Sequence, residues 1–218
     1  MSPPPVFRKK ICTSPLRSLG APTSWRQTGR QLIKRLVDVV LSLAAAVLSI
    51  VPLALLALLV KLTSKGPILY WSNRVGRNNT VFSMPKLRTM RVGTEVVATH
   101  LLRNPDECLT PIGGFLRKAS LDELPQLWCV LRGDMSIVGP RPALFNQHDL
   151  IQMRTEHGIH AIRPGLTGWA QVNGRDTLLI PEKVELDLYY LSHQSFSLDI
   201  KVICLTIFKV LGRDGVVH

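Results

Sequence analysis

One long apolar segment dominates the first third of the chain. Residues 36–60 contain a single charged side chain, Asp38, and two hydroxyl groups, those of Ser42 and Ser49. A helix over this segment would measure about 37 Å, which exceeds the roughly 30 Å of hydrocarbon in a bilayer. A helix in the core of a soluble domain is seldom so long and so uniformly apolar. The pattern therefore predicts a helix that enters a membrane.

Pro52 interrupts this segment, and proline inside a helix removes a hydrogen bond and bends the chain. The arms before and after it would measure about 24 Å and about 14 Å, so neither arm spans a bilayer alone. Both ends carry basic residues, which mark the cytoplasmic side. Two topologies stay open: a re-entrant helix broken near Ser49 and Pro52, and a spanning helix with a proline kink, which membranes tolerate. The flanking basic residues are Arg26, Arg30, Lys34, Arg35, Lys61, Lys65, Arg74 and Arg77.

The rest of the pattern predicts shorter elements. Residues 68–71 and 80–83 are expected to be strands joined by a turn at 76–79, and residues 112–118 and 185–190 to be helices. An amphipathic helix at 198–211 fits a core position or, as we favour, the membrane interface. Residues 1–26 lack apolar periodicity and are expected to be a disordered basic extension. The expected division is that extension, a membrane segment at 27–64 and a cytoplasmic domain at 65–218.

Composition adds a strong positive charge. The 27 Lys and Arg residues outnumber the 15 Asp and Glu residues, which gives a net charge of +12. So basic a chain is expected to have an anionic partner: a nucleic acid, a phosphorylated substrate or an anionic membrane surface. The four Cys residues are scattered without a Cys-x-x-Cys pair. That distribution argues against a zinc site and against a disulfide framework.

Two adjacent carboxylates are the main candidates for chemistry. Asp122 and Glu123 follow Ser120 at an expected helix start, where Ser120 and Glu123 have the spacing of a capping box. The positive end of the helix dipole favours ionised carboxylates, and the free N–H groups attract phosphate. A carboxylate beside a bound phosphate is a candidate nucleophile. A purely structural interpretation stays open, because acidic residues stabilise first turns without any catalytic role.

A glycine-rich stretch, RPGLTGWAQVNGR at 163–175, supplies further candidates. In one interpretation it forms a pocket, in which the ring of Trp169 stacks on the ligand and Arg163 and Arg175 donate hydrogen bonds to a phosphate group. In the other it is an ordinary surface turn.

Together these segments resemble the monotopic polyprenyl-phosphate phosphoglycosyl transferases, the bacterial sugar transferases that start glycan assembly, and most closely their small PglC-like members. Several independent motifs in one order, over roughly residues 34–215, make the resemblance specific. The motifs are KRLVD (34–38), KLTSKGP (61–67), FSMPKLRTM (82–90), SLDELPQLWCVLRGDMSIVGPRP (120–142), the glycine-rich stretch and ELDLYY (185–190).

The resemblance implies a mainly helical α/β monotopic membrane protein with a re-entrant helix, interfacial amphipathic helices and a catalytic domain on the cytoplasmic face of the bacterial inner membrane. It implies transfer of a sugar-1-phosphate from a UDP-sugar to polyprenyl (undecaprenyl) phosphate, with release of UMP. Asp122 would form a covalent phosphosugar intermediate, and Asp122 and Glu123 would hold Mg²⁺. Lys86, Arg117 and Arg141 match the basic positions of the family, and Arg88, Arg163 and Arg175 complete the phosphate-binding set that we expect.

At the helix break the sequence departs from the family, because the usual Ser-Pro pair is here separated as Ser49 and Pro52. The expected donor carries an N-acetylated amino sugar, with UDP-glucose and UDP-galactose as alternatives. The expected partners are this donor, the lipid acceptor and the bilayer but no nucleic acid, and a homodimer stays open.

The competing hypothesis is a membrane-anchored basic adaptor that binds nucleic acid or anionic lipid. Such an adaptor would interleave aromatic and basic residues, whereas aromatic residues make up 6% of this chain.

Overall fold

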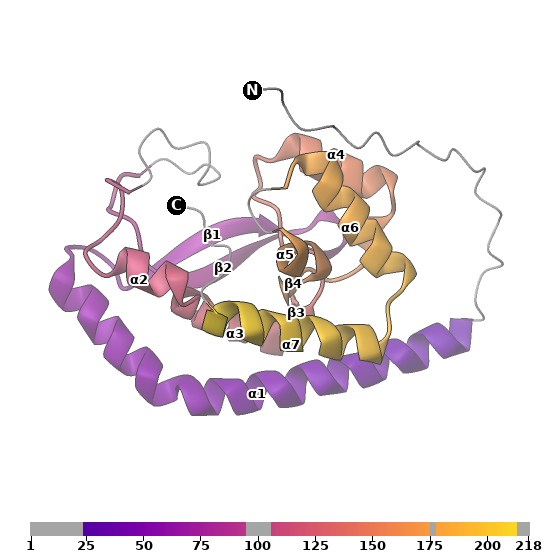
Figure 1. Cartoon of the computed structure of the whole chain (residues 1–218), viewed down its shortest axis with the longest axis horizontal. Helices are drawn as coiled ribbons and strands as arrows, with labels where there is room; N and C mark the ends of the chain where they lie inside the picture. Colours follow the sequence, from indigo (N-terminus) through magenta and orange to yellow (C-terminus); the bar gives the residue numbers. More distant parts are fainter. Residues whose placement is uncertain (1–23, 95–105, 175–177, 213–218) are drawn as a thin grey trace, which may run out of the picture.

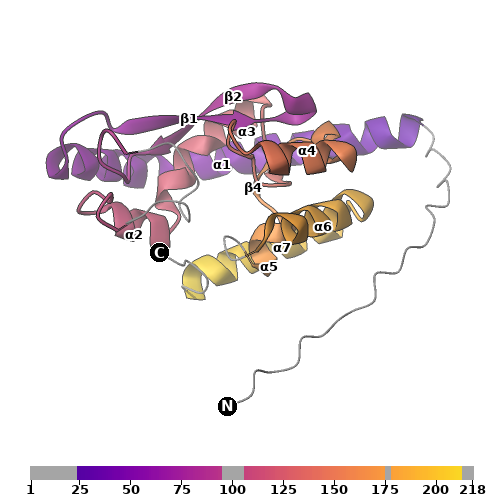
Figure 2. The same ribbon diagram turned by 90° about the horizontal axis from the view of Figure 1, so that it is seen from above.

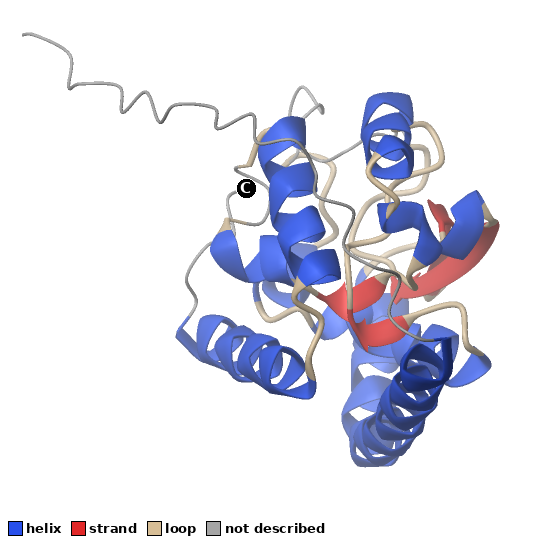
Figure 3. Cartoon of the chain, turned by 90° about the vertical axis from the view of Figure 1, so that its right-hand side faces the viewer, coloured by secondary structure: helices blue, strands red, loops and turns tan. Residues whose placement is uncertain are grey.

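The computed structural model describes residues 24–94, 106–174 and 178–212. Its short strands form a narrow band with helices on both sides (Figure 3), which confirms a mixed, mainly helical class. The elements, in which η denotes a 3-10 helix, are α1 (Ser24–Thr63), β1 (Leu69–Val75), η1 (Arg77–Asn79), β2 (Val81–Leu87), α2 (Gly113–Lys118), η3 (Leu121–Gln126), α3 (Leu127–Arg132), β3 (Ser136–Val138), α4 (His148–Glu156), η4 (Ile159–Ala161), β4 (Gly165–Thr167), α5 (Trp169–Asn173), α6 (Ile180–Ser192) and α7 (Phe196–Gly212).

The apolar segment forms one continuous helix, α1, which lies along one side of the molecule and bends along its length (Figure 1). Pro52 lies inside this helix, and the Ser49 hydroxyl donates to the Ala46 carbonyl oxygen, 3.0 Å away. Both features bend helices. The helix continues through the expected break at Ser49 and Pro52. The helix begins at Ser24, inside the expected extension, and residues 1–23 lie outside the described part of the chain.

One face of α1 packs on the rest of the protein. Its buried residues are spaced by four or seven positions, which places them on one side of a helix. This face is polar in its first half and apolar in its second half, where it joins a hydrophobic cluster with β2 and α2. The buried residues are Asp38, Ser42, Ser49, Leu56 and Val60.

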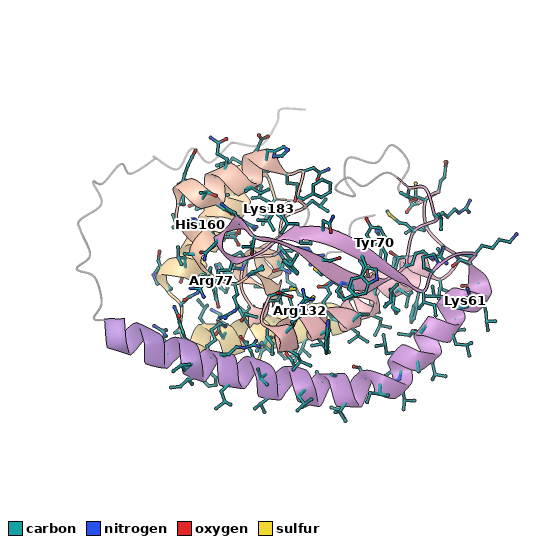
Figure 4. The ribbon with its side chains drawn as sticks, turned by 180° about the vertical axis from the view of Figure 1, so that it is seen from behind. Lys61, Tyr70, Arg77, Arg132, His160 and Lys183 are labelled. Atoms are coloured by element: carbon teal, nitrogen blue, oxygen red, sulfur yellow. The ribbon has the colours of Figure 1, made fainter. Side chains whose placement is uncertain are left out.

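The other faces of α1 are apolar and exposed, and carbon side chains project from its outer side (Figure 4). Within the described residues, α1 is the one helix that is long and apolar enough, over Gly29–Thr63, to cross a membrane. Only 11% of its most apolar 18-residue window is buried inside the protein. A core helix of a soluble domain would be mostly buried. The structure therefore supports the expected association with a membrane.

Polar side chains tie the first half of α1 to the body of the protein. Lys34 Nζ forms an ion pair with Asp199 Oδ2 on α7, at 2.7 Å. The Arg35 guanidinium donates to two backbone carbonyls of α3. Asp38 accepts a hydrogen bond of 3.1 Å from a backbone amide of β3. The KRLVD motif thus joins α1 to three other elements.

The two predicted strands are confirmed as an antiparallel hairpin, β1 and β2, although both are longer than expected. Its turn contains Asn78 and Asn79 with φ of 54° and 59°, a conformation that Asn tolerates better than most residues. Tyr70 lies opposite Lys86 in the register. Because side chains alternate along a strand, Arg74 shares the face of Tyr70 and Lys86. That face packs on α3 through a hydrophobic cluster.

The glycine-rich stretch folds as β4 and α5, and β4 pairs in parallel with β3. A Cβ at Gly165 would lie 2.1 Å from the Gly139 nitrogen, and a Cβ at Gly168 would lie 2.1 Å from the Gly139 oxygen. These glycines are needed because backbone segments touch here. The stretch is therefore a packed junction behind the turn at 139–142, and neither an open pocket loop nor a simple surface turn describes it.

The two C-terminal helices α6 and α7 lie on the side of the molecule opposite the hairpin (Figure 2). Both extend beyond the ranges expected from sequence. The buried Tyr190 hydroxyl of α6 lies 2.7 Å from Asp199 Oδ1 of α7. On α7, Val202 is fully buried, while Ile207 and Phe208 are exposed. This helix therefore has both a core face and an exposed apolar face.

Candidate active site

Asp122 and Glu123 lie on η3, a short 3-10 turn between α2 and α3. The preceding Ser120 has φ 54° and ψ 22° and makes no side-chain cap hydrogen bond. The expected capping box is therefore wrong, because a capping side chain reaches the helix N–H groups from extended backbone. A left-handed backbone at a residue other than glycine costs roughly 1–2 kcal/mol. This strained residue lies two positions before Asp122.

Asp122 is a buried carboxylate, with 6% of its surface exposed. Burial raises its pKa to about 6, since the charged form loses hydration, and the neighbouring charge of Glu123 adds to the rise. Lys86, Arg117 and Arg141 oppose this shift in the pKa. At neutral pH Asp122 is therefore mostly ionised but poorly hydrated, a state that suits a nucleophile.

Lys86 reaches the carboxylates from β2, which packs against η3. Burial lowers its pKa to about 8, and the attraction of Asp122 partly offsets that effect. Its Nζ lies 5.4 Å from the ring centroid of Tyr70, the residue opposite it on β1. Tyr70 is labelled on the hairpin in Figure 4. Lys86 is therefore a cation whose proton affinity the site has reduced.

Arg141 reaches the site from the Gly-Pro-Arg-Pro turn after β3. Its Nη2 lies 2.6 Å from Glu123 Oε1. The Arg141 and Glu123 side chains are 45% and 20% exposed, so this pair borders solvent while Asp122 is covered. A planar guanidinium in such a position suits two-point binding of a phosphate group.

Arg117 at the end of α2 is held by a residue that sequence reasoning missed. Its Nε donates to the Thr89 hydroxyl oxygen, 3.0 Å away, and Thr89 is buried. This bond fixes one edge of the guanidinium. Thr89 belongs to the FSMPKLRTM motif, but a threonine among basic residues gave no signal of this contact.

Arg74 is the second residue that was missed, since the sequence placed it only among the basic flanks of the membrane segment. Its Nη1 donates to the Pro142 carbonyl oxygen at 3.2 Å. Burial lowers the pKa of Arg74 to about 10, with a further contribution from the nearby charge of Arg141 and an opposing one from Glu123. Arg74 is therefore a fourth cation beside the carboxylate pair. Only the hairpin register, which the sequence did not give, reveals it.

The other expected phosphate-binding residues lie elsewhere. Arg88 donates to the carbonyl oxygens of Ser64 and Lys65 and so closes the C-terminal end of α1. Arg163 donates to the Gly133 carbonyl oxygen at 2.8 Å. Arg88 and Arg163 therefore have structural partners away from Asp122, and Arg175 lies outside the described residues.

Trp169 packs against other side chains and does not line an open pocket loop. Its ring stacks on Tyr189, with centroids 5.6 Å apart, and Lys201 Nζ lies 5.4 Å from its ring centroid. These contacts join α5 to α6 and α7. The indole therefore packs between helices.

The carboxylate pair suits a divalent cation whose coordination is completed by substrate phosphate oxygens and water. Mg²⁺ in proteins is commonly held by one or two carboxylates together with substrate phosphates and water. Asp122 and Glu123 supply two carboxylates. Burial and, to a smaller extent, the neighbouring charge of Glu123 raise the pKa of Asp122, and a bound cation would offset the repulsion between the two groups. In the part of the chain that is described, no group of three or more His, Cys, Asp or Glu side chains is assembled for a metal.

The chain is similar in sequence to known proteins over most of its length. The alignment with the uncharacterized sugar transferase EpsL of Bacillus subtilis (strain 168) is 39% identical over 188 residues, and it covers 85% of this chain and 90% of EpsL. That with the UDP-glucose:undecaprenyl-phosphate glucose-1-phosphate transferase of Escherichia coli (strain K12) is 42% identical over 187 residues, and it covers 82% of this chain and 40% of that protein.

A third relative is the UDP-N-acetylgalactosamine-undecaprenyl-phosphate N-acetylgalactosaminephosphotransferase of Aeromonas hydrophila. It is 35% identical over 191 residues, which are 84% of this chain and 44% of that protein. The chain thus spans less than half the length of this relative and of the Escherichia coli one. The family model described as bacterial sugar transferase matches residues 29–213. This match includes the carboxylate pair, its cations and α1 from residue 29 onward, and the chain belongs to the bacterial sugar transferase family.

Proposed function

We propose that this protein transfers a sugar-1-phosphate from a UDP-sugar to polyprenyl phosphate and releases UMP. The observation that carries the proposal is the charge arrangement around Asp122. Two adjacent carboxylates lie among four cations, which leaves an excess of positive charge for a diphosphate. The relatives from Escherichia coli and Aeromonas hydrophila are named for this class of transfer. The four cations are Lys86, Arg117, Arg141 and Arg74.

In the first step the Asp122 carboxylate attacks the sugar-proximal phosphorus of the UDP-sugar. A bond forms between a carboxylate oxygen and this phosphorus, and the bond from phosphorus to the bridging oxygen breaks. UMP leaves with the bridging oxygen and its electron pair. The covalent intermediate is a phosphosugar on Asp122, and the cations offset the charge that develops on the phosphate oxygens.

In the second step a phosphate oxygen of polyprenyl phosphate attacks the same phosphorus. The product is a polyprenyl diphosphate sugar, and Asp122 is released as a carboxylate. Because the intermediate stores the sugar-1-phosphate on the protein, one cationic site serves both anionic substrates in turn. Arg141, at the solvent-exposed edge of the site, would contact each phosphate as it enters.

A magnesium ion held by Asp122 and Glu123 would neutralise phosphate charge during both steps. Side chains of the protein bind and orient the phosphate groups. Lys86 and Arg117 hold the equatorial phosphate oxygens, and Arg141 orients the diphosphate through its planar fork.

Membrane placement follows from α1. We place the protein on the cytoplasmic face of the bacterial inner membrane, with α1 re-entrant, so that both of its basic ends stay in the cytoplasm. The presence of Pro52 inside α1 supports this topology, as do the exposed apolar faces of the helix. In this position a soluble UDP-sugar and a membrane-embedded acceptor both reach Asp122.

The sugar remains a prediction. Relatives are named for glucose and for N-acetylgalactosamine, and an N-acetylated amino sugar is the donor that we expect. The test measures UMP release by the purified full-length protein with polyprenyl phosphate and a panel of UDP-sugars. Repeated turnover, measured as continued UMP release, must depend on both substrates, whereas the UDP-sugar alone is expected to release at most one UMP per protein. If no UDP-sugar gives such release, while vesicle or nucleic-acid binding is tight, the adaptor hypothesis replaces the enzyme.

A further inference from the structure

The ELDLYY motif supplies one partner of a buried ion pair that is linked to the active site. Asp187 of this motif, on α6, accepts hydrogen bonds from Arg154 of α4: its Oδ2 lies 3.0 Å from Nε and 2.6 Å from Nη2. The two side chains are only 1% and 12% exposed. Burying two charges is costly unless the hydrogen-bonding groups of both are satisfied. Nη1 of Arg154, which does not bind Asp187, therefore needs an acceptor of its own.

This nitrogen donates a hydrogen bond to the turn at 139–142, which carries Arg141. Arg154 Nη1 donates to the backbone carbonyl oxygen of Arg141, 2.8 Å away. Arg141 is the residue whose guanidinium binds Glu123. The buried pair therefore ends on the backbone of a residue that lines the proposed phosphate site.

The backbone conformation of this turn is also restricted by its own sequence. Pro140 and Pro142 flank Arg141, and proline fixes its own φ and restricts the residue before it. Arg74 donates to the Pro142 carbonyl oxygen at 3.2 Å. Two arginine side chains thus hold two consecutive carbonyls of the turn.

We propose that Asp187 and Arg154 are positioning residues, which hold the Arg141 carbonyl so that its guanidinium points at Glu123 and at the substrate diphosphate. The identity of that substrate rests on the proposed function, whereas the positioning of Arg141 does not. Arg154 does not touch the reacting atoms. It acts through Arg141, and Asp187 acts by fixing Arg154.

The test uses Arg154→Lys in the full-length protein. Lysine keeps a positive charge for Asp187, but its single ammonium nitrogen cannot reproduce the planar guanidinium that binds Asp187 and the Arg141 carbonyl oxygen at the same time. Removing the charge altogether would leave Asp187 buried and unpaired and is avoided for that reason. Arg77→Lys is the matched control, because Arg77 also donates to a backbone carbonyl, that of Ala161 at 2.8 Å.

The first readout is a double-mutant cycle on kcat/KM from UMP release. Arg154→Lys alone is expected to lower kcat/KM by about 10- to 100-fold, the size of effect seen for slight misplacement of a catalytic group. In an Arg141→Ala background the same change is expected to have almost no further effect, because its target is gone. Equal losses in both backgrounds would mean that Arg154 serves the fold only, and the proposal would be wrong.

The second readout needs no activity. Side-chain ¹⁵N relaxation of arginine Nε–H groups reports how tightly the Arg141 side chain is held, with its signal assigned by its loss in Arg141→Ala. The order parameter is expected to fall in Arg154→Lys and to stay unchanged in Arg77→Lys. An unchanged Arg141 signal in Arg154→Lys overturns the positioning role. A wild-type protein that shows the rigid signal but releases no UMP would instead overturn the proposed function alone.

Discussion

Glu123 Oε1 and Arg141 Nη2 lie 2.6 Å apart, although 18 positions separate the two residues in the chain. Helix α3 and strand β3 fill the intervening sequence and return the Gly-Pro-Arg-Pro turn to the carboxylates. Glu123 is therefore engaged by a cation of the site, while Asp122 has no ion pair among the described residues. This division suits one carboxylate that positions substrate and one that attacks it.

Asp122→Asn is expected to abolish UMP release, because the amide is nearly isosteric but cannot form the acyl phosphate. The assay is single-turnover and steady-state UMP release. Substantial release by this variant would remove Asp122 from the nucleophile role.

The same variant carries a second readout. Folding raises the pKa of Asp122, so its charged form opposes folding at neutral pH. Asp122→Asn should raise the melting temperature by a few degrees at pH 7.5, since about 1 kcal/mol shifts it by roughly 2–4 °C at this size. The gain should disappear as the pH falls below the ordinary pKa of an aspartate, where both states of the wild type are protonated.

The pH dependence of kcat/KM is expected to be bell-shaped. Activity should fall below about pH 6, as Asp122 becomes protonated, and above about pH 8, as Lys86 loses its proton. These limits belong to the coupled cluster and not to isolated groups. In Lys86→Arg the alkaline limb should move upward by more than one pH unit, because arginine stays charged. An alkaline limb that does not move in this variant argues against Lys86 as its source.

Arg141→Lys is expected to lower kcat/KM by at least about 10-fold, although the charge is kept. Lysine cannot reproduce the planar, two-point contact of a guanidinium with phosphate. Arg132→Lys is the control, since Arg132 also pairs with a carboxylate, Asp134, at 2.6 Å. Equal activities of both variants would make Arg141 merely structural.

EDTA is expected to stop UMP release, and added Mg²⁺ to restore it, because two anionic substrates meet beside two carboxylates. Glu123→Gln should raise the Mg²⁺ concentration needed for half-maximal activity. Full activity in excess chelator contradicts the assignment of a metal to this pair.

Both ends of α1 are expected to face the cytoplasm. Single cysteines at Thr28 and at Ser64, in a background without native cysteines, should resist a membrane-impermeant reagent in intact cells. Both should react once the cytoplasm is opened. Pro52→Ala should straighten the helix and shift some molecules to a spanning form, in which position 28 is labelled from outside. Labelling of position 28 from outside in the protein with Pro52 would show that the re-entrant model is wrong and that the helix spans the membrane.

Patterns within one element predicted much of the fold. The continuous apolar run predicted α1, and two short strand-like segments around a turn at 76–79 predicted the hairpin. Ser120 shows the limit of such patterns: its spacing to Glu123 is that of a capping box, but the backbone is left-handed there. A spacing rule assumes the backbone conformation that it is used to predict.

The cations of the site show the same limit across elements. Arg74, Lys86 and Arg141 come from β1, β2 and the turn after β3, so their meeting depends on strand register and on tertiary packing. Arg88 and Arg163 have the same side chain as Arg141, but their donors bind the backbone at Ser64, Lys65 and Gly133. Residue type alone cannot separate a guanidinium that binds substrate from one that closes a helix.

The buried face of α1 has a consequence for engineering. Leu56 and Val60 pack against Leu87 and Leu116, and Asp38 binds the backbone of β3. A truncated form that begins after α1 would uncover these leucines and leave the β3 amide without its acceptor, so it would aggregate and would not yield a soluble enzyme. A generic polyleucine anchor would not replace α1 either, because it lacks the polar half of this face. The helix that we place in the membrane is thus also part of the folded core, and the two roles cannot be exchanged separately.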